Sequence, residues 1–263
     1  MAHLLATTPT LFTVVHRSVP VRTSVHHQVA QQGTRLTINP MTTHPLTSGS
    51  RIAAKISFGA AVVFLILLGA LHLIEPEIDP SWHMISEYEI GRYGWVMQLA
   101  FLCLALSSVG LVVAIRSQIE TIGGWIGLAL LLLSAAGTTI AAFYVTDPMN
   151  TPKAEMTFHG NMHGFGFILG VPTQIIAAVL IGLSLRRNQA WSSARWTLLW
   201  TAQLPWISLA IMVAIIFALL PLNGGKFGPN VLVGWPNRLY VVASCVWLMT
   251  VAWHALQSQW RQS

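Results

Sequence analysis

The stretch AAKISFGAAVVFLILLGALHLI, at residues 53–74, decides the fold class of this chain. After Lys55 it carries no charged side chain except the titratable His72, and it matches the run of about 20 apolar residues that crosses the hydrocarbon core of a bilayer. Its apolar residues do not alternate with polar ones, as they would in a strand of a membrane β-barrel. Because unpaired backbone groups are costly in lipid, the sequence predicts a transmembrane helix here.

Five more runs of this kind follow along the chain, at about residues 94–115, 122–145, 163–185, 198–220 and 239–256. Composition agrees, because only 8% of the 263 residues are charged, against about 25% in an ordinary soluble domain. A soluble enzyme and a disordered protein are thereby excluded. A disulfide scaffold is excluded too, since Cys103 and Cys245 both lie inside apolar runs. We therefore predict an all-α polytopic membrane protein, with a six-transmembrane-helix bundle in residues 51–263.

Residues 1–50 differ in composition from the rest of the chain. They contain Arg17, Arg22 and Arg35, no acidic residue, and no apolar run long enough to cross a bilayer. We expect a disordered basic N-terminal tail outside the bundle. Met41 opens a short polar lead into the first span, and it is the candidate natural start of the protein.

Positive charges in the short connections predict the orientation, because Lys and Arg are enriched on the cytoplasmic side. One side receives Arg51, Lys55, Arg116, Arg186, Arg187, Arg195 and Arg261, and the other receives only Arg92, Lys153, Lys226 and Arg238. Both termini are therefore predicted to be cytoplasmic, in a multi-pass protein of the cell (inner) membrane that contacts membrane lipids. Nucleic acid is not an expected partner, because the basic residues are neither clustered nor interleaved with exposed aromatic residues. A protein partner and self-association both remain open.

The middles of the spans hold no Asp, Glu, Lys or Arg. Ion-coupled carriers usually hold an ionisable residue there, so a small-molecule transporter is the weaker alternative. Neutral polar residues do occur at mid-span, and we expect them to form hydrogen bonds between helices. They are Gln98, Ser107, Ser108, Thr138, Thr139, Thr173, Gln174, Thr201, Gln203 and Ser244.

Histidines and acids gather at the predicted outer end of the bundle. His159 and His163 lie four residues apart where the fourth span opens, so a helix would place them on one face. Neutral imidazoles at this spacing can chelate Zn²⁺, and His83 and Asp147 are candidate further ligands. A zinc ion held in this way could activate water for hydrolysis.

A structural role for these histidines is the favoured alternative. The pair lacks the internal Glu of the metalloprotease His-Glu-x-x-His motif. In the structural interpretation, His159 and His163 cap the helix and form hydrogen bonds to neighbouring spans or to Asp147. Glycines at 160, 164, 166 and 170 would let a neighbouring helix approach closely.

The connection at residues 75–93 is the long loop of the chain, and loops of this length are more often functional than idle. Glu87 is a candidate catalytic carboxylate, paired with Glu89, and Ser86 is a candidate nucleophile with His83 three residues before it. The alternative is an interfacial loop whose acids have no chemical role. Further residues predicted at the outer face are Glu89, Arg92, Trp235 and Arg238.

Three short motifs together resemble a known family. They are His83-x-x-Ser86-Glu87 through Gly91-x-Tyr-Gly-Trp95, Asp147 followed by His159-Gly and His163, and Gly234-Trp-Pro-Asn-Arg238-Leu before the last span. They resemble the six-helix integral membrane family catalogued as domain of unknown function 998, over about residues 53–258. The resemblance implies a prokaryotic-type integral membrane protein and leaves the activity open.

The residue types at the outer end are also similar to those of alkaline ceramidases and adiponectin-receptor-like membrane hydrolases. This weaker analogy implies a zinc ion held by a His-x-x-x-His pair, a third His and an Asp, with a Ser beside it. The matching residues here are His159, His163, His83, Asp147 and Ser86. The chain departs in having six predicted spans, in placing the pair in the fourth span, and in having Ser86 after His83.

Two main hypotheses about the activity follow. The favoured one is a non-enzymatic membrane protein whose outer cluster binds a lipid headgroup, a small ligand or a partner protein. The alternative is a metal-dependent hydrolase, with zinc as its cofactor, that acts on a lipid or amide at the outer leaflet. The hydrolase hypothesis requires His159 and His163 to converge beside a cavity with His83, Asp147 or Glu87.

Overall fold

The computed structural model describes residues 48–257, and within this range the protein has six long helices and no strand. The helices are α1 (Ser48–Ile74), α2 (Gly94–Ile115), α3 (Ile122–Phe143), α4 (Phe158–Leu185), α5 (Arg195–Leu219) and α6 (Gly234–Gln257). Short 3₁₀ helices, η1 (Ile85–Ile90), η2 (Arg116–Gln118), η3 (Gln189–Trp191) and η4 (Pro221–Asn223), lie in the connections. All six long helices are long and apolar enough to cross a membrane, which confirms the predicted all-α polytopic fold.

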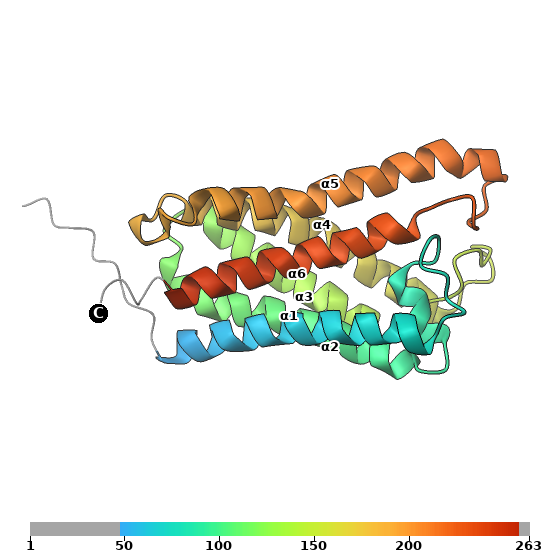
Figure 1. Ribbon diagram of the computed structural model, residues 1–263, viewed down its shortest axis with the longest axis horizontal. Coiled ribbons are helices and arrows are strands. Elements are labelled where there is room, and N and C mark those ends of the chain that lie inside the picture. The colour runs from blue at the N-terminus through green and yellow to red at the C-terminus, as the bar shows by residue number, and fades with distance from the viewer. Residues whose placement is uncertain (1–47, 258–263) are drawn as a thin grey trace, which may run out of the picture. The chain divides into compact units, whose positions relative to one another are not determined.

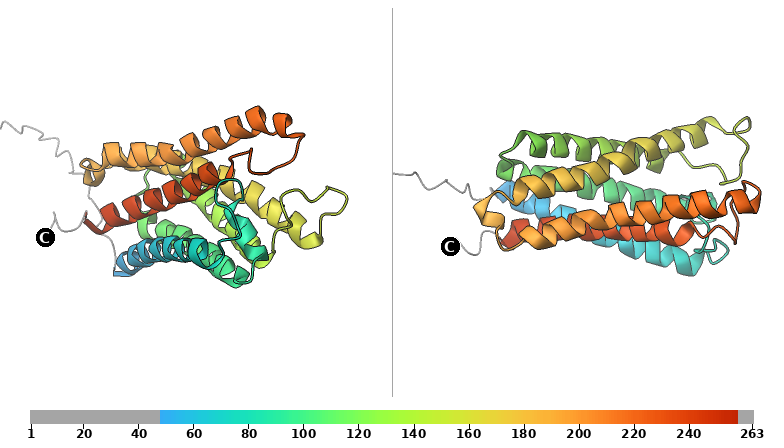
Figure 2. Two further views of the ribbon diagram at one scale, coloured as in Figure 1. Left: turned by 45° about the vertical axis from the view of Figure 1, so that its right-hand side comes forward. Right: turned by 90° about the horizontal axis from the view of Figure 1, so that it is seen from above.

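Successive helices run in opposite directions, so the connections alternate between the two ends of the bundle (Figures 1 and 2). The longer connections, 75–93, 144–157 and 220–233, lie together at the end on the right of Figure 1. We name this the loop end, and it is the end that the charge pattern predicts to face outward. The start of α1 and the end of α6 lie at the opposite end.

Glycines allow a close contact between α3 and α4. A Cβ atom on Gly137 would lie 2.6 Å from the carbonyl oxygen of Gly166 and 2.6 Å from the backbone nitrogen of Gly170. Only small residues let two helix backbones meet at this separation. The close approach expected at residues 166 and 170 is therefore confirmed. Gly164 has no part in it, because a Cβ there would meet nothing within 4 Å.

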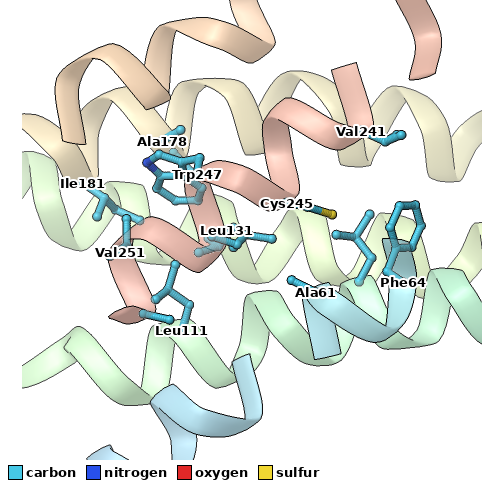
Figure 3. Close-up of a cluster of buried hydrophobic side chains, with 14 of the residues drawn as sticks. Ala61, Phe64, Leu111, Leu131, Ala178, Ile181, Val241, Cys245, Trp247 and Val251 are labelled. Atoms are coloured by element: carbon cyan, nitrogen blue, oxygen red, sulfur yellow. The ribbon is translucent and has the colours of Figure 1, made fainter. Parts of the chain in front are cut away.

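The hydrophobic core lies mainly where α1, α2, α3, α4 and α6 meet. Its two largest fully buried side chains are Trp191 and Trp247, the latter on α6. In Figure 3 the indole of Trp247 lies beside Ala178 and Ile181 of α4, with Leu131 of α3 close by. Helix α5 is peripheral, since only 22% of its apolar window is buried within the chain. The packed core therefore comes mainly from the other five helices, and α5 adds Leu198 and Ala202 to it.

Three helices begin about five residues earlier than hydropathy predicts. They start at Ser48, Phe158 and Gly234 instead of residues 53, 163 and 239. Hydropathy marks the part of a helix that lies in hydrocarbon, whereas the helix itself continues to its cap. In α4 that cap is Thr157, whose Oγ1 accepts a hydrogen bond from Gly160 N at 3.0 Å. Residues 48–50 thus belong to α1, and the rest of the predicted tail, residues 1–47, lies outside the described residues.

Candidate functional site

Buried glutamates organise the loop end, and Glu87 of η1 is one of them. Its Oε2 accepts a hydrogen bond from Nδ1 of His83 at 2.7 Å, and its Oε1 accepts one from the backbone N–H of Met149 at 3.0 Å. A buried carboxylate needs such partners because its removal from water is costly. Glu87 therefore joins the 75–93 connection to the 144–157 connection.

Glu89 joins the same two connections to α4. Its Oε2 accepts from the backbone N–H of Thr146 at 3.1 Å and lies 3.2 Å from Nδ1 of His163. The same Nδ1 donates to the carbonyl oxygen of Tyr144 at 2.9 Å, so the neutral ring of His163 is left with Nε2 as an acceptor. Burial raises the pKa of the Glu89 carboxyl, and the hydrogen bond from His163 opposes that rise.

Asp147 holds the beginning of α4. Its two oxygens accept hydrogen bonds from the backbone N–H of Thr157 at 2.8 Å and from the hydroxyl of Thr157 at 2.9 Å. The carboxylate also lies against Gly160, where a Cβ would collide with it. An anion at a helix N-terminus is favourable because it compensates the helix dipole. Asp147 therefore has a structural role, because it binds Thr157 at the start of α4.

Arg238 of α6 ties three parts of the loop end together. Its Nε donates to Nε2 of His72 at 2.7 Å, and its Nη1 donates to the carbonyl oxygens of His83 at 2.7 Å and Gly234 at 3.1 Å. Its Nη2 donates to the Tyr88 hydroxyl at 3.3 Å. Arg238 is only 6% exposed, so it lies inside the loop end and not on its surface. The guanidinium fixes the 75–93 connection against α1 and α6.

A cavity of about 240 Å³ opens among these residues, and we name it the loop-end cavity. Its polar lining comes from the 75–93 connection, the 144–157 connection and α4, and consists mainly of Ser86, Glu87, Asp147 and His163. Its apolar lining includes Met84, Met149 and Phe167. Among the described residues, no lysine or arginine lines it. Four of the residues singled out in the sequence therefore share one cavity.

A smaller cavity of about 80 Å³ lies deeper, among α2, α3, α4 and α6, and we name it the inner cavity. It shares the lining residues Met84, Ser86 and Phe167 with the loop-end cavity. Its walls are mostly apolar, and its polar residues are Ser86, Thr138, Gln174, Asn237 and Tyr240. The two cavities together lead from the polar loop end into the middle of the bundle.

The His-x-x-x-His pair of α4 does not point at one site. His163 is buried beside Glu89, whereas His159 is exposed and its ring packs edge-on against Tyr144, with 5.3 Å between ring centroids. The reason is that α4 begins at Phe158, five residues before the predicted span, and in its first turn Phe158, His159 and Asn161 are exposed while Gly160 is buried. The two histidines share one face of the helix, but His159 is exposed and His163 is buried, so they do not form one site.

The other predicted zinc ligands are engaged in separate contacts, His83 with Glu87 and Asp147 with Thr157. Along residues 48–257 there is no group of three or more His, Cys, Asp or Glu side chains that could hold a metal ion. The predicted donor set is divided among separate contacts and does not fit a zinc site.

The remaining predicted outer-face residues lie away from both cavities. Arg92 is exposed and its guanidinium lies over the ring of Tyr93, 5.5 Å from the ring centroid. Trp235 is 55% exposed at the start of α6. These two residues are surface groups of the loop end.

Sequence reasoning missed two polar residues at the end of α1. Glu75 is fully buried and accepts a hydrogen bond from the backbone N–H of Tyr93, while its carboxylate fills the space beside Gly91. His72 accepts from Arg238. A His and a Glu directly after an apolar run usually meet water at the interface, so no local signal indicates that Glu75 is buried and His72 half-buried. Only the return of the 75–93 connection over the end of α1 covers them.

One comparison with known proteins gives a match. Residues 58–254 match the family described as Protein of unknown function (DUF998). The match reaches from α1 to α6 and confirms the resemblance that the three motifs indicate. No curated protein and no solved structure matches the chain.

Proposed function

The chain belongs to the DUF998 family of integral membrane proteins, and we propose that it is a non-enzymatic binding protein for a membrane lipid with an ammonium headgroup. The loop-end cavity takes the headgroup, and the inner cavity receives the part of the lipid that follows it. One observation carries this proposal. The loop-end cavity is lined by the carboxylates of Glu87 and Asp147 and, among the described residues, by no lysine or arginine.

Charge selects the kind of headgroup. Two carboxylates beside a cavity that is partly withdrawn from water attract a cation and repel an anion. Their existing hydrogen bonds hold Glu87 and Asp147 in place, and each carboxylate oxygen keeps further lone-pair capacity. A primary ammonium group brings three N–H donors to these acceptors. The cavity therefore suits an amine-bearing headgroup better than an anionic one.

The apolar walls indicate that the ligand is a lipid and not a free amine. Met84, Met149 and Phe167 line the loop-end cavity, and Phe167 is 40% exposed on the bundle surface that the bilayer would cover. A membrane cavity with a polar end and apolar walls matches an amphiphile in both parts. Because the charge pattern predicts the loop end to face outward, the ligand is a lipid of the outer leaflet.

Lipid binding to the purified protein in detergent tests the proposal. Native mass spectrometry would compare lysophosphatidylethanolamine, which carries an ammonium group, with lysophosphatidylglycerol of the same chain length, which does not. We expect the wild type to bind the former about tenfold more tightly, equivalent to about 1.4 kcal/mol. Glu87→Gln combined with Asp147→Asn removes both negative charges at nearly constant shape, so the preference should disappear.

Glu77→Gln is the matched control, because Glu77 is an exposed acid of the same connection outside both cavities. It should bind both lipids as the wild type does. Equal affinity of the wild type for the two lipids would overturn the proposal. So would an unchanged preference in the doubly substituted protein.

Filling the cavity gives a second, independent test. Gly164 lines the loop-end cavity and a Cβ there meets nothing within 4 Å, so Gly164→Phe can place its ring in the cavity without displacing backbone. This variant should lose binding of lysophosphatidylethanolamine. Gly69→Phe is the control, since a Cβ on this α1 glycine also meets nothing within 4 Å and the residue lines neither cavity.

A second candidate function, hydrolysis of a lipid ester or amide, is supported by one observation. Ser86 and His163 line the same cavity, and in a neutral His163 whose Nδ1 donates to Tyr144, Nε2 is the nitrogen that can accept a proton from a hydroxyl nucleophile. Incubation with lysophosphatidylethanolamine would then release free fatty acid, and Ser86→Ala would stop the release. If the wild type releases no more fatty acid than buffer does, this candidate is excluded.

A further inference from the structure

Gln174 of α4 has an unused hydrogen-bond donor at the inner cavity. The residue lines this cavity and is only 5% exposed. Its Oε1 accepts a hydrogen bond from the Tyr240 hydroxyl at 3.0 Å, and its Nε2 has no partner among the described residues. Leaving a buried amide N–H unpaired is costly, so such a group indicates a missing acceptor.

The lining of the inner cavity restricts what that acceptor can be. Among the described residues, no Asp, Glu, Lys, Arg or His lines it. A carboxylate or phosphate would have to leave water without meeting a counter-charge, which is strongly unfavourable. A neutral carbonyl oxygen accepts from an amide N–H and has a much smaller desolvation cost. The chemistry of the site therefore favours an ester or amide carbonyl.

We propose that the inner cavity is the binding site for the acyl carbonyl group of the lipid, with Gln174 Nε2 donating a hydrogen bond to the carbonyl oxygen. Tyr240 is a positioning residue, because its hydroxyl holds the other end of the Gln174 amide. This inference rests on the proposed function, since the headgroup in the loop-end cavity brings the acyl group to the inner cavity.

The arrangement of the two cavities agrees with the layout of a lysolipid. The cavities share Phe167, and Gln174 lies seven residues further along α4, which is about 10 Å along a helix axis. The glycerol group would follow this path toward the ester, while the phosphate stays in the loop-end cavity, where the ammonium group of the same lipid is its counter-charge. An inner cavity of about 80 Å³ holds a carbonyl and the first methylenes but not a whole acyl chain. The rest of the chain leaves past the partly exposed Phe167 into the bilayer.

A comparison of two lipids that differ only at the carbonyl tests this site. The probes are lysophosphatidylethanolamine with an acyl ester and its 1-O-alkyl ether analogue, which has the same headgroup and chain length but no carbonyl. We expect the wild type to bind the ester about tenfold more tightly, as one well-placed hydrogen bond in a buried site would give. Gln174→Leu should weaken binding of the ester to the level of the ether and leave binding of the ether unchanged.

Gln98→Leu is the matched control, because Gln98 is a half-buried amide of α2 that lines neither cavity. It should keep the wild-type preference for the ester. Tyr240→Phe should reduce that preference without abolishing headgroup selection, which separates positioning of Gln174 from general damage to the bundle.

The outcomes separate this inference from the proposed function. If the wild type binds ester and ether equally but still prefers the ammonium headgroup, water satisfies Gln174, and the carbonyl site is overturned while the proposed function stands. If lysophosphatidylethanolamine does not bind in either form, both are overturned. The comparison on the wild type needs no variant, so poor folding of Gln174→Leu would not prevent a decision.

Discussion

Nε of Arg238, on α6, donates a hydrogen bond across 2.7 Å to Nε2 of His72, on α1. Nδ1 of His72 donates in turn to the carbonyl oxygen of Leu68 at 2.7 Å. The imidazole must therefore be the neutral tautomer with its proton on Nδ1, because a doubly protonated ring could not accept at Nε2. Through this bond, the last turn of α1 fixes the guanidinium that holds the 75–93 connection in place.

His72→Phe should destabilise the protein by leaving the buried Arg238 Nε without an acceptor. Loss of a hydrogen bond to a charged group costs about 1.5–3 kcal/mol, and thermal unfolding in detergent should show a lower melting temperature. Arg238→Lys should lower it further, since an ammonium group cannot reproduce the several directed bonds of a guanidinium. Arg92→Lys, at an exposed position, should stay within about 0.5 kcal/mol of the wild type. An unchanged melting temperature for His72→Phe would show that the bond does not stabilise the fold.

Gly137→Ala should also destabilise the bundle, by forcing α3 away from α4. The new Cβ would lie 2.6 Å from backbone atoms of Gly166 and Gly170, and such overpacking typically costs about 1–3 kcal/mol. Gly123→Ala, in the same helix, is the control, because a Cβ there meets nothing within 4 Å. Alanine favours helix over glycine, so this control should melt at or above the wild-type temperature. If both variants melt alike, the α3–α4 contact does not limit stability.

The fold could be predicted from the sequence because each span carries its own signal. A run of about 20 apolar residues must form a helix in lipid whatever its neighbours do, so residues 53–74 alone predict α1. The ends of a helix are determined by capping hydrogen bonds and not by hydropathy. For this reason α4 begins at Phe158, five residues before the apolar run at residue 163. The cap formed by Thr157 and Asp147 lies in the polar connection, where hydropathy gives no information.

The site could be predicted only in part, because it depends on contacts between distant segments. Sequence position predicted that Glu87, Asp147 and His163 lie at the same end of the bundle, and all three line the loop-end cavity. The i, i+4 spacing of His159 and His163 could not show that the first is exposed and the second is buried. Whether a mid-span amide is fully paired depends on the neighbouring helix. Gln174 has its predicted interhelical bond, yet its second polar atom is left unpartnered.

Glu89 should make the stability of the protein depend on pH. Burial raises the pKa of its carboxyl above the ordinary value of 4.5, so the folded state holds the proton more tightly than the unfolded state does. This contribution to stability is complete below pH 4.5 and decreases as the pH rises through the raised pKa of the folded state. We would measure the melting temperatures of the wild type and Glu89→Gln from pH 4.5 to pH 8. The melting temperature of the wild type should fall more over this range than that of Glu89→Gln, because only the wild type loses the contribution of the protonated Glu89.

Glu77→Gln provides the comparison for this measurement, because Glu77 is exposed and its removal should leave the wild-type pH dependence intact. Parallel curves for the wild type and Glu89→Gln would contradict the prediction, since they would mean that Glu89 takes up no proton on folding in this range.

The loop end should be accessible from outside the cell if the orientation predicted from Lys and Arg is right. Cysteine scanning in intact bacteria can check this, in a background where Cys103 and Cys245 are replaced by alanine. Ala154→Cys and Gln189→Cys introduce thiols at exposed positions at opposite ends of the bundle, and neither changes a charge that could itself alter the topology. A membrane-impermeant maleimide should label residue 154 in intact cells and residue 189 only after lysis. The reverse pattern would place the two cavities at the cytoplasmic face, and the lipid would then have to come from the inner leaflet.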